Sequence, residues 1–121
     1  MKKKSLILAV FTALIIFNCA NDSEDDLIDP NSLPAIVNYV DHIKPIIDNN
    51  CIGCHSNPPV NGAPISLITY QDVKSAVQNN HLISKINGNG PGELMPLGGQ
   101  KLPQLTIDLI TKWETDGLLE N

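Results

Sequence analysis

The residues best able to do chemistry in this chain stand together in one pentapeptide, CIGCH, from Cys51 to His55. Two cysteines separated by two residues can bind a metal ion, form a redox disulfide, or make thioether bonds to the vinyl groups of a porphyrin. The histidine that follows directly favours the porphyrin, because its imidazole can ligate the iron from the side of the thioethers. The pentapeptide alone leaves the three chemistries open.

A second axial ligand for such an iron is available in ELMPLGG, a stretch rich in proline and glycine that carries Met95. A methionine thioether is a soft ligand that raises the reduction potential of porphyrin iron. The alternative for Met95 is a core residue that fills a gap. His42 or His81 could take its place and give bis-histidine iron, although both are also typical polar surface residues.

The N-terminus has the features of an export signal. Lys2, Lys3 and Lys4 precede an apolar run from Leu6 to Phe17, which is too short for a comfortable membrane span. The run ends in IIFNC, which resembles a bacterial lipobox. This resemblance implies that residues 1–18 are a lipoprotein signal peptide and that Cys19 is lipidated. The alternative for Cys19 is a chance cysteine at the end of an ordinary signal peptide.

The rest of the chain divides into a tether and a domain. Residues 19–34 are acidic and poor in apolar side chains, which predicts a flexible tether behind the lipid. Residues 35–121 are then one small domain, whose core is marginal without the apolar surface of a cofactor. We expect an exported protein, anchored by lipid to the bacterial membrane on its periplasmic or cell-surface side.

Charge excludes one class of partner. Without residues 1–18 the chain keeps five lysines and thirteen acidic residues, a formal net charge of −8, and it has no arginine. Such a chain cannot neutralise phosphates, so nucleic acid is not an expected partner. A partner attracted by long-range electrostatics is expected to present a basic surface.

Apolar periodicity predicts helices and no convincing strand. The predicted helices are one near 41–50, a second capped by Thr69, a short third that begins near Leu82, and a fourth over 104–116 that Gly117 ends. NPPVNGAP and NGNGPG are loops. The predicted fold class is therefore all-α, with three to five helices.

Three segments, IKPIIDNNCIGCH, ELMPLGG and QLTIDLITKWETDG, together resemble the small class I mono-haem cytochromes c. The likeness extends over residues 39–119, nearly the whole domain. It implies the class I cytochrome c fold around one covalent haem c, with the first and last helices packed beside it. By this likeness Cys51 and Cys54 carry the thioethers, and His55 and Met95 are the axial ligands.

The same likeness implies further contacts with the haem. In the family a proline carbonyl accepts a hydrogen bond from the ligand imidazole, and Pro64 is the candidate here, with Pro58 and Pro59 as alternatives. Tyr70 and Trp113 are candidates for packing against the haem, and core packing is the alternative for Trp113. Because arginine is absent, the haem propionates would need groups such as Tyr70, Lys85 or Lys101.

An electron carrier is the function that these features favour, rather than an enzyme, because an iron with both axial positions filled does not readily bind a substrate. Its partners would be redox proteins. The alternatives are a haem enzyme or sensor in which the methionine dissociates, and an accessory cytochrome subunit of a larger redox complex. A zinc or thiol module lacks a second close pair of ligands and a βαβ context.

Overall fold

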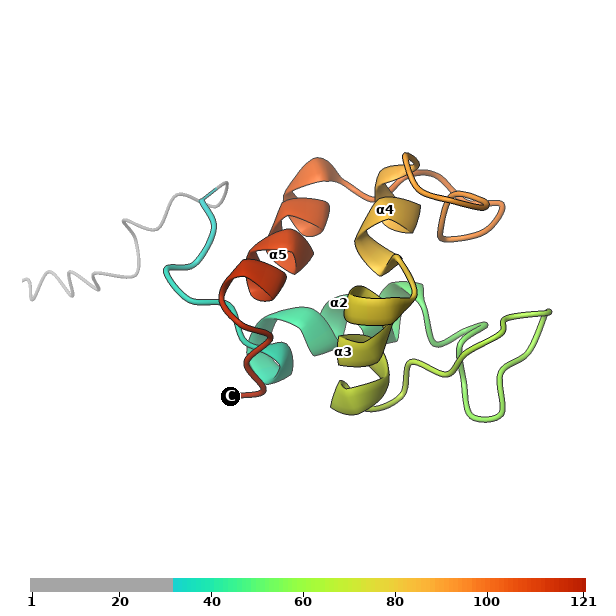
Figure 1. Ribbon diagram of the computed structural model, residues 1–121, viewed down its shortest axis with the longest axis horizontal. Coiled ribbons are helices and arrows are strands. Elements are labelled where there is room, and N and C mark those ends of the chain that lie inside the picture. The colour runs from blue at the N-terminus through green and yellow to red at the C-terminus, as the bar shows by residue number, and fades with distance from the viewer. Residues whose placement is uncertain (1–31) are drawn as a thin grey trace, which may run out of the picture. The chain divides into compact units, whose positions relative to one another are not determined.

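The computed structural model describes residues 32–121 (Figure 1). The regular secondary structure of these residues is helical, as the apolar periodicity predicts. The described part of the chain contains no strand, and Asn38 and Leu119 form an isolated parallel bridge. The helices are η2 (Tyr39–Ile43), α2 (Lys44–Asn50), α3 (Tyr70–Asn79), α4 (Leu82–Asn87) and α5 (Gln104–Thr115).

The first helical segment begins earlier than the sequence predicts. Asn38 caps it, since its side-chain oxygen accepts a hydrogen bond of 2.8 Å from the backbone N–H of Asp41. The π-helical turn η2 continues directly into α2, where Pro45 lies in the first turn and displaces no intrahelical donor. Ile43 and Ile47 are buried in the core.

The other helices end where local sequence predicts. The side chain of Thr69 and that of Asp72 form a reciprocal capping box at the start of α3, which ends at the asparagine pair 79–80. Gly88 (φ 74°) ends α4, and Gly117 (φ 96°) follows α5 in the left-handed conformation that favours glycine.

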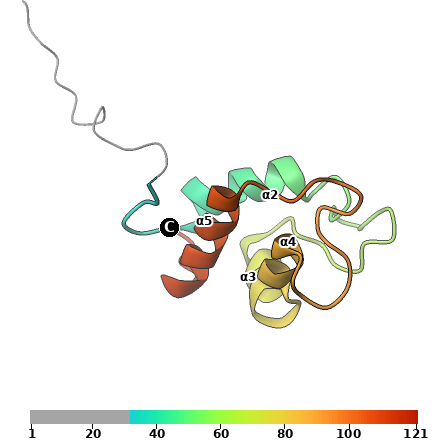
Figure 2. The same cartoon turned by 90° about the horizontal axis from the view of Figure 1, so that it is seen from above.

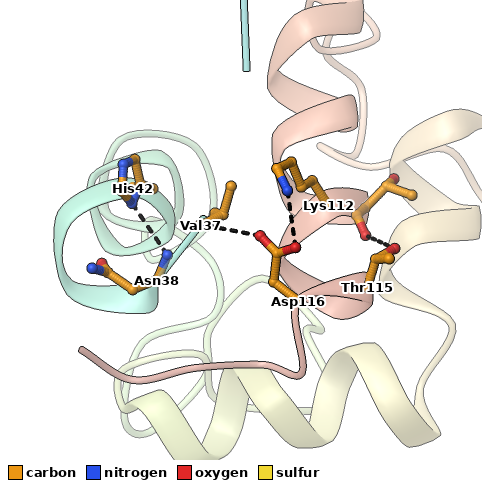
Figure 3. A network of polar contacts seen from close by, with 7 residues as sticks. Val37, Asn38, His42, Lys112, Thr115 and Asp116 are labelled. Atoms are coloured by element: carbon orange, nitrogen blue, oxygen red, sulfur yellow. Dashed lines mark hydrogen bonds and ion pairs between the residues drawn. The ribbon is translucent and has the colours of Figure 1, made fainter. Parts of the chain in front are cut away.

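The two ends of the described chain are hydrogen-bonded to each other through residues 37–40 and 116–120, which we call the clasp. The N–H groups of Tyr39 and Val40 donate to the carbonyls of Leu119 and Glu120 at 2.9 and 3.1 Å. The N–H of Val37 donates to Asp116 Oδ2 at 2.8 Å, and Lys112 holds the other oxygen of that carboxylate at 2.9 Å (Figure 3). The clasp therefore joins η2 to the end of α5.

An aromatic cluster packs beside the clasp. The ring centroids of Tyr39 lie 5.4 Å from Tyr70 and 5.9 Å from Trp113, distances typical of favourable aromatic pairs. Tyr70 Oη donates to the Leu118 carbonyl at 2.7 Å, and Trp113 Nε1 donates to the Leu119 carbonyl at 2.8 Å. Trp113 is completely buried and Tyr70 is partly buried, so these bonds satisfy polar atoms that packing removes from water.

Two long connections lie at the other end of the domain. Figure 1 and Figure 2 both place residues 51–69 and residues 88–103 at the end away from the C-terminus. These connections contain most of the chain's prolines and glycines, and they carry CIGCH and Met95. The helices therefore form the frame, and the two connections enclose the region where chemistry was predicted.

Candidate functional site

A cavity of about 740 Å³ lies between the two long connections and the ends of α2, α3 and α4. This volume is within the range of small-molecule and cofactor sites. Cys51, Cys54, His55 and Met95 all line it. The structure thus brings the four principal residues predicted from the sequence to the wall of one cavity, although they extend over positions 51 to 95.

The end of α2 positions the CIGCH segment. The N–H of Cys51 donates to the Ile47 carbonyl at 2.8 Å, and the N–H groups of Cys54 and His55 donate to the Cys51 carbonyl at 3.1 and 2.9 Å. This tight turn carries both sulfurs, which are free thiols, to the cavity. Burial raises the pKa of the Cys51 thiol to about 11, whereas a redox-active cysteine needs a lowered thiol pKa.

His55 is held by two bonds to the connection that follows it. Its Nδ1 lies 2.8 Å from the Ile65 carbonyl, and its own carbonyl accepts the N–H of Leu67 at 2.8 Å. A carbonyl only accepts, so Nδ1 carries the proton and Nε2 is the nitrogen left to ligate a metal.

The acceptor predicted from the family likeness was wrong by one residue. Pro64 lines the cavity, but the carbonyl at Nδ1 belongs to Ile65, and Pro58 and Pro59 are not its partners either. Residues two apart in non-helical chain present their polar groups to the same side. Leu67 donates to the His55 backbone and Ile65 accepts at the His55 ring, so these two alternate residues are the ones bonded to His55.

Met95 reaches the cavity on a connection that is fixed to α4. Its N–H donates to the Lys85 carbonyl at 3.1 Å, and Lys85 Nζ donates to the Pro91 carbonyl at 3.0 Å. Gly90 packs so closely on α4 that a Cβ there would lie 2.4 Å from the Cβ of Ser84. The half-buried Met95 is therefore held by its backbone on the cavity wall rather than inside the main core.

The two alternative histidines differ. His81 lines the cavity, where it precedes α4 in the left-handed conformation (φ 57°). His42 lies outside the cavity, and its Nδ1 accepts the N–H of Asn38 at 3.2 Å (Figure 3). Of the lysines suggested for propionates, Lys85 lines the cavity, whereas Lys101 is bonded to Gln104 instead.

Tyr70 and Trp113 do not line the cavity, so the structure does not bring them to the predicted site. Both belong to the aromatic cluster, and their polar atoms bind carbonyls of residues 118 and 119. The physical reason is that the clasp supplies carbonyl acceptors next to the cluster, which position these rings at the opposite end. Core packing, the alternative for Trp113, is its observed role.

The cavity wall combines metal-ligating side chains with apolar ones. Within residues 32–121, no three His, Cys, Asp or Glu side chains are grouped closely enough to hold a metal ion. The thiols, the imidazole and the thioether instead surround a wide space with apolar walls that include Leu67, Leu82 and Ile86. A porphyrin offers separate attachment points for thiols at its edge and for axial ligands at its centre.

Sequence reasoning missed several residues of this wall. The acceptor Ile65, the exposed Leu97 and four asparagines at positions 50, 61, 79 and 80 line the cavity as well. The asparagines had a signal, since they stand at helix ends and turns in segments that flank the motif.

Comparisons with protein-family models, with curated proteins and with solved structures find no match to this chain. The predicted signal peptide of residues 1–18, the predicted lipidation site Cys19 and nearly all of the predicted tether of residues 19–34 lie outside the described residues. Among the residues that the structure describes, no helix is long and apolar enough to cross a membrane.

Proposed function

We propose that this chain is an electron carrier with one covalently bound haem c, folded as a small class I cytochrome c. Cys51 and Cys54 would form the thioethers, and His55 and Met95 would be the axial ligands of the iron. When bound, the haem supplies an iron that accepts and donates one electron. The protein would also be exported and held at the bacterial membrane by a lipid on Cys19.

The observation that carries the proposal is the meeting of four residues on one cavity wall. The two thiols and the imidazole come from one turn, and the thioether comes from a connection forty residues later in the chain. None of the four is fully buried, and Cys54 is exposed, so core packing does not account for the whole set, although Cys51 and Met95 pack against the core. A haem with a C-x-x-C-H attachment and a methionine ligand requires all of them.

The protein's own groups would prepare this site in two ways. The Ile65 carbonyl fixes the tautomer and orientation of His55, which makes the imidazole a stronger and better directed ligand. The apolar wall excludes water and lowers the local dielectric, which affects the reduction potential of a bound iron. With both axial positions filled by protein, electron transfer is favoured over reactions of bound substrates.

Expression together with a c-type cytochrome maturation system tests the proposal. The purified protein is expected to keep the mass of one haem after denaturation and to give the pyridine haemochrome spectrum of a haem with two thioethers. Cys51→Ala and Cys54→Ala should each lose one thioether. Ser56→Ala, a change in the next turn, is the matched control and should load haem normally.

Absence of covalent haem from the unaltered protein under these conditions would refute the proposed function. A resting spectrum of high-spin iron would instead support the haem enzyme or sensor, because it requires an open axial position. Zinc released on denaturation would support a metal module.

A further inference from the structure

Charge is distributed unevenly between the two ends of the domain. Residues 32–121 contain eight carboxylates and five lysines, but only Glu93 and Lys85 line the cavity. These two charges have opposite signs. The protein therefore contributes no formal net charge to the cavity wall when His81 is neutral.

The exposed part of this wall, which we call the cavity rim, consists mainly of amides and apolar groups, and Glu93 and His81 are also exposed on it. Four of its residues are exposed asparagines, at positions 50, 61, 79 and 80. Leu97 is also part of the rim and is 57% exposed. Such a surface is wet and partly apolar, as the contact faces of transient protein complexes often are.

Negative charge collects instead around the clasp. Asp41, Glu114 and Glu120 are exposed there, and backbone bonds of Val40 hold Glu120 beside the start of η2. In the views of Figures 1 and 2, the C-terminus and the two long connections occupy opposite ends of the domain. At physiological ionic strength the Debye length is about 8 Å, so the clasp charges are largely screened at the rim.

We propose that the cavity rim is the docking face for a redox protein whose own contact surface is uncharged and partly apolar. This inference rests on the proposed function, since it assumes that electrons leave through the cavity. It departs from the expectation of a basic partner that the formal charge of −8 suggests. A basic surface would be attracted to the clasp, where it would lie far from the site.

Paramagnetic probes test where charge acts on the protein. The protein in solution is titrated with two redox-inert complex ions, hexacyanochromate(III) and tris(ethylenediamine)chromium(III), and broadening of backbone amide NMR signals is measured. Among residues 32–121, the cation should broaden amides near Asp41, Glu114 and Glu120 most strongly. Neither ion should concentrate at Asn61 or Asn80. Equal broadening by the cation at the rim and at the clasp would overturn the inference.

Two substitutions, one near each end of α3, test whether charge on the rim changes the rate of electron exchange. Asn80 lies on the rim, whereas Gln71 is exposed in the first turn and outside the cavity wall. Nine residues of helix separate them by about 14 Å, which exceeds the Debye length of about 10 Å at 0.1 M salt. Asn80→Lys and Gln71→Lys therefore each add one positive charge to the protein, but only Asn80→Lys places that charge on the rim.

Oxidation of the reduced protein by hexacyanoferrate(III) is followed at 0.1 M salt. Asn80→Lys should raise the second-order rate constant about two- to four-fold, and Gln71→Lys should leave it nearly unchanged. For the unaltered protein, the dependence of this rate constant on salt concentration should correspond to an effective charge much smaller in magnitude than −8. This effective charge includes the propionates of the haem itself. Equal rate changes in the two variants, or a salt dependence that fits −8, would overturn the inference.

The two proposals fail in different ways. Loss of the haem spectrum refutes the proposed function, and the NMR measurement still decides where small ions gather because it requires no electron transfer. A normal haem spectrum with cations gathered at the rim refutes the docking face alone.

Discussion

The clasp and the cavity are two ends of one small domain built on different physical principles. At the clasp, backbone hydrogen bonds and the buried rings of Tyr39 and Trp113 hold the chain ends together. At the cavity, loops rich in proline and glycine form much of the wall, and a few backbone bonds fix their positions. Stability is therefore concentrated at one end, and the chemically capable side chains are concentrated at the other.

This difference explains why so small a domain can carry a large cavity. The aromatic cluster and the helix faces form the fully buried core, and Cys51, Ile52 and Met95 pack against it while only partly buried. Under the proposed function, the haem would be the missing core of the other end, where its apolar surface would replace packed side chains. The following predictions test whether the two ends are as unequal as their packing indicates.

The largest effect on stability is expected from Trp113→Ala. Trp113 is completely buried, so the substitution leaves a cavity in the core and removes the hydrogen bond to the Leu119 carbonyl. The free energy of unfolding, measured by denaturant titration, should fall by about 3–5 kcal/mol. Leu97→Ala is the control at the other end, and as a surface change it should stay within about 0.5 kcal/mol. Similar losses in the two variants would contradict the comparison.

A smaller loss is expected from Gly90→Ala, which tests how the Met95 connection is held. The new Cβ would lie 2.4 Å from the Cβ of Ser84, so the connection or α4 must shift. Such overpacking should lower the free energy of unfolding, measured by denaturant titration, by about 1–3 kcal/mol. Gly53→Ala is the matched control, because its Cβ would meet nothing within 4 Å. If both variants were equally stable, the connection would not be packed on α4 as described.

Tyr70→Phe should cost about 0.5–1.5 kcal/mol of unfolding free energy, because it removes the hydroxyl that donates to the Leu118 carbonyl at the clasp. Ser56→Ala removes a bond of similar length, to the Pro58 carbonyl, from the exposed surface at the cavity end. Water replaces that bond, so a smaller loss is expected. A larger loss in Ser56→Ala would show that burial does not distinguish the two ends.

The clasp should also be sensitive to acid. The Lys112 side chain and the N–H of Val37 lower the pKa of Asp116 below its ordinary value of 3.8, and the Thr69 backbone N–H likewise lowers that of Asp72. A carboxylate whose pKa is lowered by folding stabilises the fold above its ordinary pKa. This stabilisation is lost as the pH falls through about 4 and below.

Thermal unfolding between pH 6 and pH 2.5 measures this loss. Asp116→Asn should reduce the fall in melting temperature over this range, since its side chain cannot be protonated. The control is Glu114→Gln, a change of the same kind at an exposed position on α5. If Glu114→Gln reduced the fall in melting temperature as much as Asp116→Asn, the carboxylate of Asp116 would not be the source of the acid sensitivity.

The sequence predicts the helical frame well because local signals decide it. The cap at Thr69 begins α3 and Gly117 follows the end of α5, and both signals act within one turn of the chain as expected. The same holds for CIGCH, whose chemistry depends on the spacing of neighbouring residues.

Contacts between distant residues could not be predicted in the same way. The clasp joins residues 37–40 to residues 116–120, and no local pattern indicates that pairing. The clasp also fixes the positions of Tyr70 and Trp113, which the family likeness offered as candidates for haem packing, with core packing as the alternative for Trp113. Ile65 was missed for a related reason, because the register of its connection depends on the bond between Leu67 and the His55 backbone.

The most direct test of the central claim is the proton NMR spectrum of the reduced, haem-loaded protein. If residues 1–18 are removed as predicted, Met95 is the only methionine, so its methyl signal has one possible source. If its sulfur ligates the iron, the ring current of the haem shifts this signal far upfield, and Met95→Leu removes it while His81→Ala keeps it. A spectrum with no upfield methyl, or one in which His81→Ala changes the ligation and Met95→Leu does not, would contradict the account.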